Sequence, residues 1–368
     1  MLAFYACTNT QIINMINVKE QYYRDENADL YILKKNRVDL DLIKCIEEAN
    51  VFNSIVFIEP YVLPQNALNK IFNLFIAHSP NKYYRNYVLK AIGNKNYDKF
   101  LTFGFWADAL YVLEVFYKKN KNIKVEFVEE GLVNYFPYDK ELYYCRAYSG
   151  YKEKIIRFCA HGINLFLLKK RMRNTYMYKP QFIEDSKFEL KEIRAVDFSQ
   201  NQILKKIFCA YFEYAGENIQ KYKDIDFVYL LDNYDFDRHI SLIKYYYAQC
   251  KGKSFIIKAH PENTIAEIKT LQENFQNIKI DTSNFYFESI AAFYNLNNIC
   301  LISRGSSSAY TMHVLFNVNY HNILIYKLFD YKNYDEIICE ADKFWKFMNN
   351  IYGNFIIINK IEREGNDE

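Results

Sequence analysis

The stretch that decides the fold is Ser254-Phe255-Ile256-Ile257-Lys258-Ala259-His260-Pro261. Its short, continuous apolar run is typical of a strand buried in a parallel sheet. Pro261 has no amide hydrogen and disfavours helical geometry in the residue before it, so His260 is predicted to be extended. The histidine therefore stands at the carboxyl end of a strand, which is where open α/β sheets bind their ligands.

Two other predicted strands also end in polar residues. Lys124-Val125-Glu126-Phe127-Val128 runs into Glu129-Glu130-Gly131, and Asn298-Ile299-Cys300-Leu301-Ile302 runs into Ser303-Arg304-Gly305-Ser306-Ser307-Ser308. An acidic pair, a histidine and a serine cluster thus follow three strands. These three strand ends supply the candidate functional residues.

Composition excludes several classes of protein. The 368 residues suit two domains, and an apolar fraction of 51% excludes global disorder. With 47 basic and 44 acidic residues the net charge is +3, too balanced for a protein that binds nucleic acid by neutralising phosphates. The eight cysteines are scattered without a C-x-x-C pair, which indicates thiols in a reducing compartment rather than disulfides or a zinc site.

The location expected from the sequence is cytoplasmic. Met1 to Cys7 has no basic leader and is too short for a signal peptide, so it is predicted to be the first strand. The apolar helix predicted at 155–168 is too short to span a bilayer. It is followed by Lys169-Lys170-Arg171-Met172-Arg173, and such a basic end could contact an anionic inner membrane face. A packed helix with cations at its C-terminus is the favoured interpretation.

The order of elements predicts an α/β fold with two doubly wound, Rossmann-like domains whose parallel sheets are covered on both faces. A break in the pattern between 134 and 198 places the domains at 1–175 and 176–368. Thr8-Asn9-Thr10-Gln11 is predicted to be a polar turn. Strands are expected at 2–6, 29–33, 54–58, 100–103, 125–128, 227–231, 255–259, 278–281, 298–302, 323–326 and 355–358. Helices are expected at 12–22, 39–48, 65–77, 108–117, 239–250, 265–274, 287–294, 307–316 and 334–349.

Each strand end has a chemical interpretation and an ordinary one. A helix N-terminus behind Gly305 can bind an anion, but a serine there can simply be a cap. His260 can donate to a phosphate or protonate a leaving group, whereas a lone loop histidine more often bonds a carbonyl. Adjacent side chains on a strand point to opposite faces, so one of Glu129 and Glu130 can act as a base. A solvated acidic turn is the alternative.

Together and in this order, the motifs resemble those of bacterial sialyltransferases. The resemblance is based on the motifs Glu129-Glu130-Gly131, His260-Pro261 and Ser306-Ser307-Ser308. The opening Cys7-Thr8-Asn9-Thr10-Gln11 is similar to the start of glycosyltransferase family 52, the lipooligosaccharide sialyltransferases. The resemblance spans most of the chain through short motifs, and it implies the two-domain GT-B fold.

The resemblance implies a metal-independent, inverting transfer of sialic acid from CMP-sialic acid to a galactoside of a cell-surface glycan, a lipooligosaccharide or a capsule, through an α2,3 link. The N-terminal domain would hold the acceptor and the base, with Glu129 favoured over Glu130. The C-terminal domain would bind the donor and need no cofactor. His260 would stabilise the departing CMP. The residues implied to bind the donor are Pro261, Arg304, Gly305, Ser306, Ser307 and Ser308; those implied near the substrates are Thr8, Asn9, Thr10 and Gly131.

Several alternatives stay open at this stage. The acceptor could be sialic acid in an α2,8 link, the donor another nucleotide sugar, and a homodimer is compatible with the resemblance. A glycan-binding protein with a degenerate site is the non-enzyme alternative. Asp235-Phe236-Asp237 and Asp39-Leu40-Asp41 have metal-binding spacing but are interpreted as caps and turns. No G-x-G-x-x-G, P-loop or G-x-S-x-G motif is present, which disfavours dinucleotide enzymes, P-loop proteins and esterases.

Overall fold

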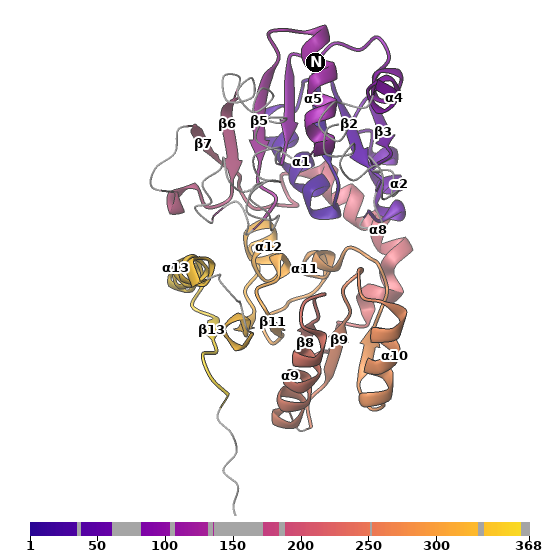
Figure 1. Ribbon diagram of the computed structural model, residues 1–368. Coiled ribbons are helices and arrows are strands. Elements are labelled where there is room, and N and C mark those ends of the chain that lie inside the picture. Colours follow the sequence, from indigo (N-terminus) through magenta and orange to yellow (C-terminus); the bar gives the residue numbers. More distant parts are fainter. Residues whose placement is uncertain are drawn as a thin grey trace, which may run out of the picture. The chain divides into compact units, whose positions relative to one another are not determined.

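The computed structural model describes residues 1–34, 38–60, 82–103, 107–131, 135, 172–183, 188–250, 252–329 and 335–361 (Figure 1). The chain divides into two compact units. The first comprises Met1–Glu130 and Pro137–Ile193, and the second comprises Gly131–Phe136 and Arg194–Glu368. Each unit is built on its own parallel sheet.

The first unit holds a seven-stranded sheet in the order β3-β2-β1-β4-β5-β6-β7. Every residue of the inner strands β1 and β2 is buried, so helices and loops cover both faces. The strands are β1 (Leu2–Ala6), β2 (Ala28–Leu33), β3 (Ser54–Ile58), β4 (Lys99–Thr102), β5 (Lys124–Val128), β6 (Met172–Met177) and β7 (Glu189–Glu192). The described helices are α1 (Asn9–Tyr22), α2 (Leu40–Ala49), α4 (Lys82–Ile92), α5 (Ala107–Lys119) and the 3₁₀ turn η2 (Pro180–Phe182).

The second unit holds a six-stranded sheet in the order β10-β9-β8-β11-β12-β13. On one face Tyr229 and Ile257 pack with Leu242 and Leu271 of two covering helices. The strands are β8 (Phe227–Leu230), β9 (Phe255–Lys258), β10 (Lys279–Asp281), β11 (Cys300–Ser303), β12 (His321–Leu324) and β13 (Phe355–Ile357). The described helices are α8 (Gln202–Gln220), α9 (Phe236–Gln249), α10 (Ile265–Asn274), α11 (Ile290–Phe293), α12 (Ser307–Phe316), α13 (Asp335–Tyr352), η3 (Phe287–Ser289) and η4 (Tyr326–Leu328).

The strand order reverses once in each sheet. In the first unit β1 pairs with β2 on one side and β4 on the other, and in the second unit β8 pairs with β9 and β11. All of these pairings are parallel, so the carboxyl ends of the strands share one edge in each sheet. This is the doubly wound arrangement that the sequence predicts, and the predicted fold class is confirmed.

The structure corrects the sequence expectation at the start of the chain. The segment 8–11, predicted to be a polar turn, is the beginning of α1. Thr8 caps the helix by accepting the amide of Gln11, and residues 9–11 form the first helical turn. The polar composition of the segment reflects capping and buried hydrogen bonds rather than a solvated turn.

Two strands and two helices of the described residues, β6, β7, α4 and α8, are absent from the sequence expectation. β6 and β7 extend the first sheet, and the chain passes to the second unit after Ile193. The expected boundary between 175 and 176 therefore falls inside β6. The residues of β7, Glu-Leu-Lys-Glu, form a charged edge strand that has no apolar pattern to recognise. α8 lies in a region that the expectation leaves unassigned, and the expected helices at 65–77 and 155–168 lie outside the described residues.

No helix in the described part of the chain combines the length and hydropathy needed to cross a membrane. Lys169 to Arg171 lie outside the described residues, and Met172 and Arg173 begin β6.

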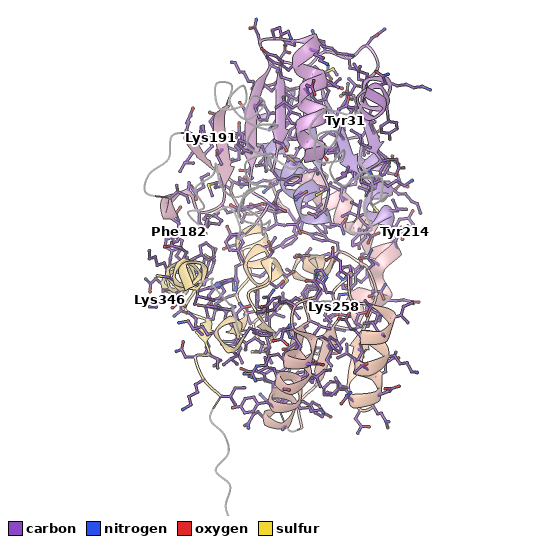
Figure 2. The ribbon with its side chains drawn as sticks, viewed as in Figure 1. Tyr31, Phe182, Lys191, Tyr214, Lys258 and Lys346 are labelled. Atoms are coloured by element: carbon purple, nitrogen blue, oxygen red, sulfur yellow. The ribbon has the colours of Figure 1, made fainter. Side chains whose placement is uncertain are left out.

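A buried ionic cluster joins β9 and β10 of the second unit. Asp281 accepts the hydroxyl of Tyr222 at 2.6 Å and lies 3.3 Å from Lys221 Nζ and 3.7 Å from Lys258 Nζ (Lys258 is labelled in Figure 2). Burial alone would raise the pKa of Asp281, but the Lys258 ammonium and hydrogen bonds from Ser283 and Tyr222 outweigh it. The pKa of Asp281 is therefore lowered.

We predict that Asp281→Asn lowers the free energy of unfolding by about 3 kcal/mol at pH 7, because the buried Lys258 loses its counter-charge. A lowered folded-state pKa gives stability that is complete above the unfolded-state pKa of about 3.9 and is lost as the pH falls. The difference in the free energy of unfolding between the wild-type protein and the variant should therefore become smaller below about pH 4. Urea denaturation at several pH values measures it, and a difference that stays constant down to pH 3 would contradict the assignment. Asp25→Asn, an exposed carboxylate, should change stability by less than about 0.5 kcal/mol.

Candidate functional site

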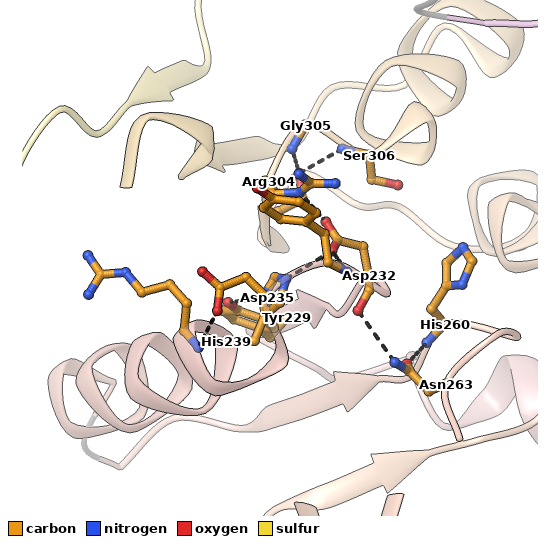
Figure 3. Close-up of polar contacts among 12 residues, drawn as sticks. Tyr229, Asp232, Asp235, His239, His260, Asn263, Arg304, Gly305 and Ser306 are labelled. Atoms are coloured by element: carbon orange, nitrogen blue, oxygen red, sulfur yellow. Dashed lines mark hydrogen bonds and ion pairs between the residues drawn. The ribbon is translucent and has the colours of Figure 1, made fainter. Parts of the chain in front are cut away.

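The strand order of the second unit gathers three polar segments at one edge of its sheet. Asp232 follows the end of β8, His260 follows the end of β9, and Arg304 follows the end of β11. Because β8 pairs in parallel with both neighbours, these segments lie next to one another at the point where the strand order reverses. Figure 3 shows the resulting group of polar side chains. This is the place where the fold predicts a ligand.

The carboxylate of Asp232 links two elements in this group. Its Oδ2 accepts a hydrogen bond from Nε of Arg304 at 2.5 Å, and its Oδ1 accepts a hydrogen bond from Nε2 of His239 at 3.1 Å (Figure 3). Burial would raise the pKa of Asp232, but the hydrogen bond from His239 and the charge of Arg304 outweigh burial and lower it. Asp232 is thus held as the carboxylate. Arg304 in turn lies over the ring of Tyr234, 4.4 Å from its centroid.

His239 is itself oriented from the interior. It is fully buried in α9, and its Nδ1 lies 2.7 Å from the hydroxyl of Tyr229 on β8. Burial keeps the pKa of Tyr229 well above its ordinary value, so the tyrosine is protonated and can donate to Nδ1. Nε2 of His239 then carries the hydrogen donated to Asp232. A chain from Tyr229 through His239 and Asp232 therefore positions Arg304.

His260 is held by its own loop. Its amide donates to Oδ1 of Asn263 at 2.8 Å, and its Nδ1 accepts the amide of Glu262 at 3.2 Å. Since an amide can only donate, Nδ1 is the acceptor nitrogen and Nε2 carries the hydrogen. Figure 3 shows the ring turned away from Asn263. The imidazole therefore presents an N–H donor from a partly exposed position, while the following Pro261 is exposed.

The serine cluster forms the turn between β11 and α12. Gly305 adopts a φ of +112°, a conformation that side chains disfavour, and its amide donates to Ser303 Oγ at 3.3 Å. Ser306 caps α12 by accepting the amide of Ser308. The hydroxyl of Ser308 donates to the buried Glu288 at 2.7 Å, whereas Ser307 is exposed. The predicted helix cap is present, and it leaves the α12 N-terminus at the same sheet edge.

The acidic pair lies at the end of β5 in the first unit, and its two members differ. Glu129 is buried and its Oε2 accepts the amide of Tyr178, beyond β6, at 2.8 Å. Glu130 is partly exposed, and its Oε1 accepts Nε2 of Gln11 at 2.9 Å. The two carboxylates therefore face different surroundings, as the alternation along a strand requires.

α1 presents amide side chains to the acidic pair. Gln11 and Asn14, three residues apart, share one face of the helix and are both buried. Asn14 donates to the backbone carbonyl of Glu129 at 3.0 Å, and the hydroxyl of Tyr178 donates to Asn14 at 2.9 Å. The sequence prediction places 8–11 in a turn and identifies neither Gln11 nor Asn14. The signal that could have found them is the three-residue spacing of two amides among the apolar residues Ile12, Ile13 and Met15.

The residues expected near the substrates have defined positions. Thr8 is the cap of α1, and Thr10 lies in its first turn, partly exposed. Asn9 is buried, and its Oδ1 accepts the amide of Asp39 at 2.9 Å, so its side chain ties α1 to the start of α2. Gly131 has a φ of +144° and belongs to the second unit.

Gly131 lies near the serine turn within the second unit. A Cβ placed on Gly131 would lie 3.5 Å from Oγ of Ser307, so the glycine backbone lies against the serine turn. The positive φ explains why glycine follows the two acids.

The segments with metal-binding spacing act as helix caps. Asp235 caps α9 by accepting the amide of Arg238, and Asp39 caps α2 by accepting the amide of Asp41. No group of three or more His, Cys, Asp or Glu side chains with metal-binding geometry occurs within the described ranges.

No family model matches the chain, and no curated protein matches it significantly. Among solved structures, a proposed UDP-N-acetylglucosamine 2-epimerase from Listeria monocytogenes is similar with a TM-score of 0.50 and 12% identity, over 88% of this chain and 78% of that one. MnaA of S. aureus, in a structure with UDP, is similar with a TM-score of 0.49 and 10% identity, over 88% of this chain and 78% of that one. UGT2 of Phytolacca americana, in a complex with UDP-2-fluoro-glucose and pterostilbene, is similar with a TM-score of 0.49 and 9% identity, over 98% of this chain and 86% of that one.

At these sequence identities the similarity concerns the fold alone. The comparison of folds rests on the Listeria monocytogenes structure. Two Rossmann-like units, each with a parallel sheet whose order reverses once, define the chain as a GT-B fold protein.

We predict opposite effects from two glycine substitutions. Gly305→Ala should lower the free energy of unfolding by about 1–3 kcal/mol, because a side chain is strained at this φ. Gly216→Ala, inside α8 where the added Cβ makes ordinary contact with Phe212 at 3.5 Å, should raise it by about 0.5–1 kcal/mol. Chemical denaturation followed by circular dichroism measures both. Equal effects of the two changes would rule out the strained turn.

Proposed function

We propose that this protein is an inverting glycosyltransferase that transfers sialic acid from CMP-sialic acid to a hydroxyl of a galactoside in a cell-surface glycan. The observation that carries the proposal is the gathering of His260, Arg304 and the α12 N-terminus at the strand-order reversal of the second unit. These are three kinds of anion-binding group: an imidazole N–H, a guanidinium and the positive end of a helix dipole. Such a group suits the phosphate of a nucleotide sugar.

The donor chemistry follows from the charges present. When the bond between the sugar and the phosphate breaks, the electron pair remains on the phosphate oxygen of CMP. Arg304 and the dipole of α12 would stabilise this negative charge without reorganisation, and in many enzymes such stabilisation contributes more to the rate than any other effect. His260 would donate a hydrogen bond from Nε2 to the same phosphate. The site would use protein donors at the phosphate, where other glycosyltransferases hold a metal ion.

The acidic pair supplies the second requirement of the reaction. A carboxylate removes the proton from the acceptor hydroxyl, whose oxygen forms the new bond to the anomeric carbon as CMP leaves from the opposite side. One base and one stabilised leaving group suffice for a single inverting displacement. The resemblance of the short motifs to those of family 52 sialyltransferases supports CMP-sialic acid as the proposed donor. An α2,3 link is the proposed product and an α2,8 link to sialic acid the variant to be compared.

We expect the purified protein to release CMP and form sialyl-lactose from CMP-sialic acid and lactose with EDTA present. Mass spectrometry of the product and a coupled assay for CMP measure the reaction, and sialyl-lactose as acceptor tests the α2,8 alternative. Turnover of UDP-N-acetylglucosamine instead, including epimerisation at C2, would overturn the proposed donor. Glycan binding without any turnover would support the non-enzyme alternative.

The role of His260 can be separated by two substitutions. Gln can place an N–H donor where Nε2 lies, whereas Asn cannot reach that position. If His260 donates a hydrogen bond to the phosphate, His260→Gln should retain kcat within about 10-fold and His260→Asn should lose about 10²-fold or more. Steady-state kinetics with CMP-sialic acid measure both. Equal losses of about 10²–10⁴-fold in the two variants would assign proton transfer to His260 instead.

A further inference from the structure

The two adjacent carboxylates of the first unit are held in different ways. Glu129 is buried, its carboxylate binds the Tyr178 amide, and its carbonyl binds Asn14. These bonds connect β5 to the segment after β6 and to α1. Glu130 reaches the surface in part, and its Oε1 accepts Nε2 of Gln11. Glu129 therefore has the setting of a structural group, and Glu130 has the setting of one that can meet a substrate.

We propose that Glu130 is the catalytic base and that Gln11 is the positioning residue that orients it. The proposal rests on the glycosyl transfer proposed above and replaces the expectation that Glu129 is the base. A base must reach the hydroxyl from which it takes the proton. Glu129 has 1% of its surface exposed and its Oε2 is bonded to the Tyr178 amide, so it does not present its carboxylate at the surface.

The orientation of Gln11 is fixed by its other hydrogen bond. Its Oε1 accepts the backbone amide of Cys7 at 2.7 Å, and because an amide nitrogen only donates, the oxygen of Gln11 must face Cys7. Nε2 must then face Glu130. Gln11 is fully buried, so water does not compete for this bond. Cys7 directly follows β1, at the strand-order reversal of the first sheet.

A neutral amide is a suitable partner for a base. It directs one oxygen of Glu130 without placing a full positive charge beside it, and a base depends on its affinity for a proton. A lysine or arginine in the place of Gln11 would hold the carboxylate more tightly but weaken it as a base. The second unit uses the opposite arrangement, an arginine and a helix N-terminus, where negative charge would develop.

The first experiment compares Glu130→Gln with Glu129→Gln by kcat for sialyl transfer, with thermal unfolding as a check on folding. Glu130→Gln should lower kcat by about 10²–10⁴-fold and leave the melting temperature near that of wild type. Glu129→Gln keeps an oxygen for the Tyr178 amide and should retain kcat within about threefold. The reverse pattern, or full activity in Glu130→Gln, would overturn the proposal.

The second experiment tests Gln11 through Gln11→Glu. This change keeps the oxygen that accepts the Cys7 amide, and it replaces the donor to Glu130 with a carboxylate oxygen that repels the negative charge of Glu130. It should lower kcat by about 10- to 100-fold and leave the KM for CMP-sialic acid unchanged, because Gln11 acts through Glu130 and not on the donor. Gln21→Glu is the matched control: the same change on the same helix, where the side chain donates to Asn17 rather than to the acidic pair. Equal effects of the two variants would contradict a positioning role.

The activity of the wild-type protein distinguishes a failure of the proposed function from a failure of the assignment of the base. If the wild-type protein transfers sialic acid and Glu130→Gln does so equally well, the assignment of the base is wrong and the function stands. If the wild-type protein turns over no nucleotide sugar, the proposed function is wrong and the assignment of the base falls with it.

Discussion

The candidate site of the second unit depends on the carboxylate of Asp232. It binds His239 of α9 and Arg304 beyond β11, and the backbone carbonyl of Asp232 accepts Nδ2 of Asn263, which holds the amide of His260. One residue thus fixes the segments that follow three neighbouring strands. Its lowered pKa keeps it charged, so that Arg304 always has a partner of opposite sign. Without this carboxylate, a partly buried guanidinium would remain at the sheet edge with its main counter-charge removed.

The two units use one topology with opposite chemistry. In each sheet the polar groups lie beyond the carboxyl ends of parallel strands: they follow β8, β9 and β11 in the second unit, and β5 in the first. The first unit surrounds its carboxylates with neutral amides from α1, whereas the second unit pairs its groups through charge. The neutral setting suits a group that gains a proton. The charged setting suits a ligand that carries negative charge.

Local signals in the sequence predict most of the fold. The bounds of α10 and α12 agree with expectation because a capping threonine and a capping serine mark their starts. β7 is missed because an edge strand of charged residues has no apolar alternation. α8 carries buried residues at 204, 207, 208, 211, 215 and 219, so a helical period is present in a region that the sequence expectation leaves unassigned.

The site is less predictable than the fold. The strand ends point to Glu129, Glu130, His260 and the serine turn, because polar residues after a buried strand are visible in sequence. The bonds that orient them are not, since Gln11 lies 119 residues from Glu130 and Arg304 lies 72 residues from Asp232. Nor can sequence tell which of two adjacent carboxylates is buried. That difference arises from Tyr178, which comes next to β5 only through the pairing of β6.

The path of the chain between the units has a consequence for their independence. The short segment Gly131–Phe136 comes from the first half of the chain but belongs to the second unit. Tyr135 of this segment is fully buried, and its hydroxyl accepts a hydrogen bond from the hydroxyl of Tyr310 at 2.6 Å. The centroids of the Tyr135 and Phe344 rings are 5.0 Å apart. A fragment that begins at Arg194 would lack this interior ring, leaving a cavity and a hydroxyl without its partner. The units are therefore not modules that a single recombination point could exchange between related proteins, because one crossover would always leave the second unit without part of its own core.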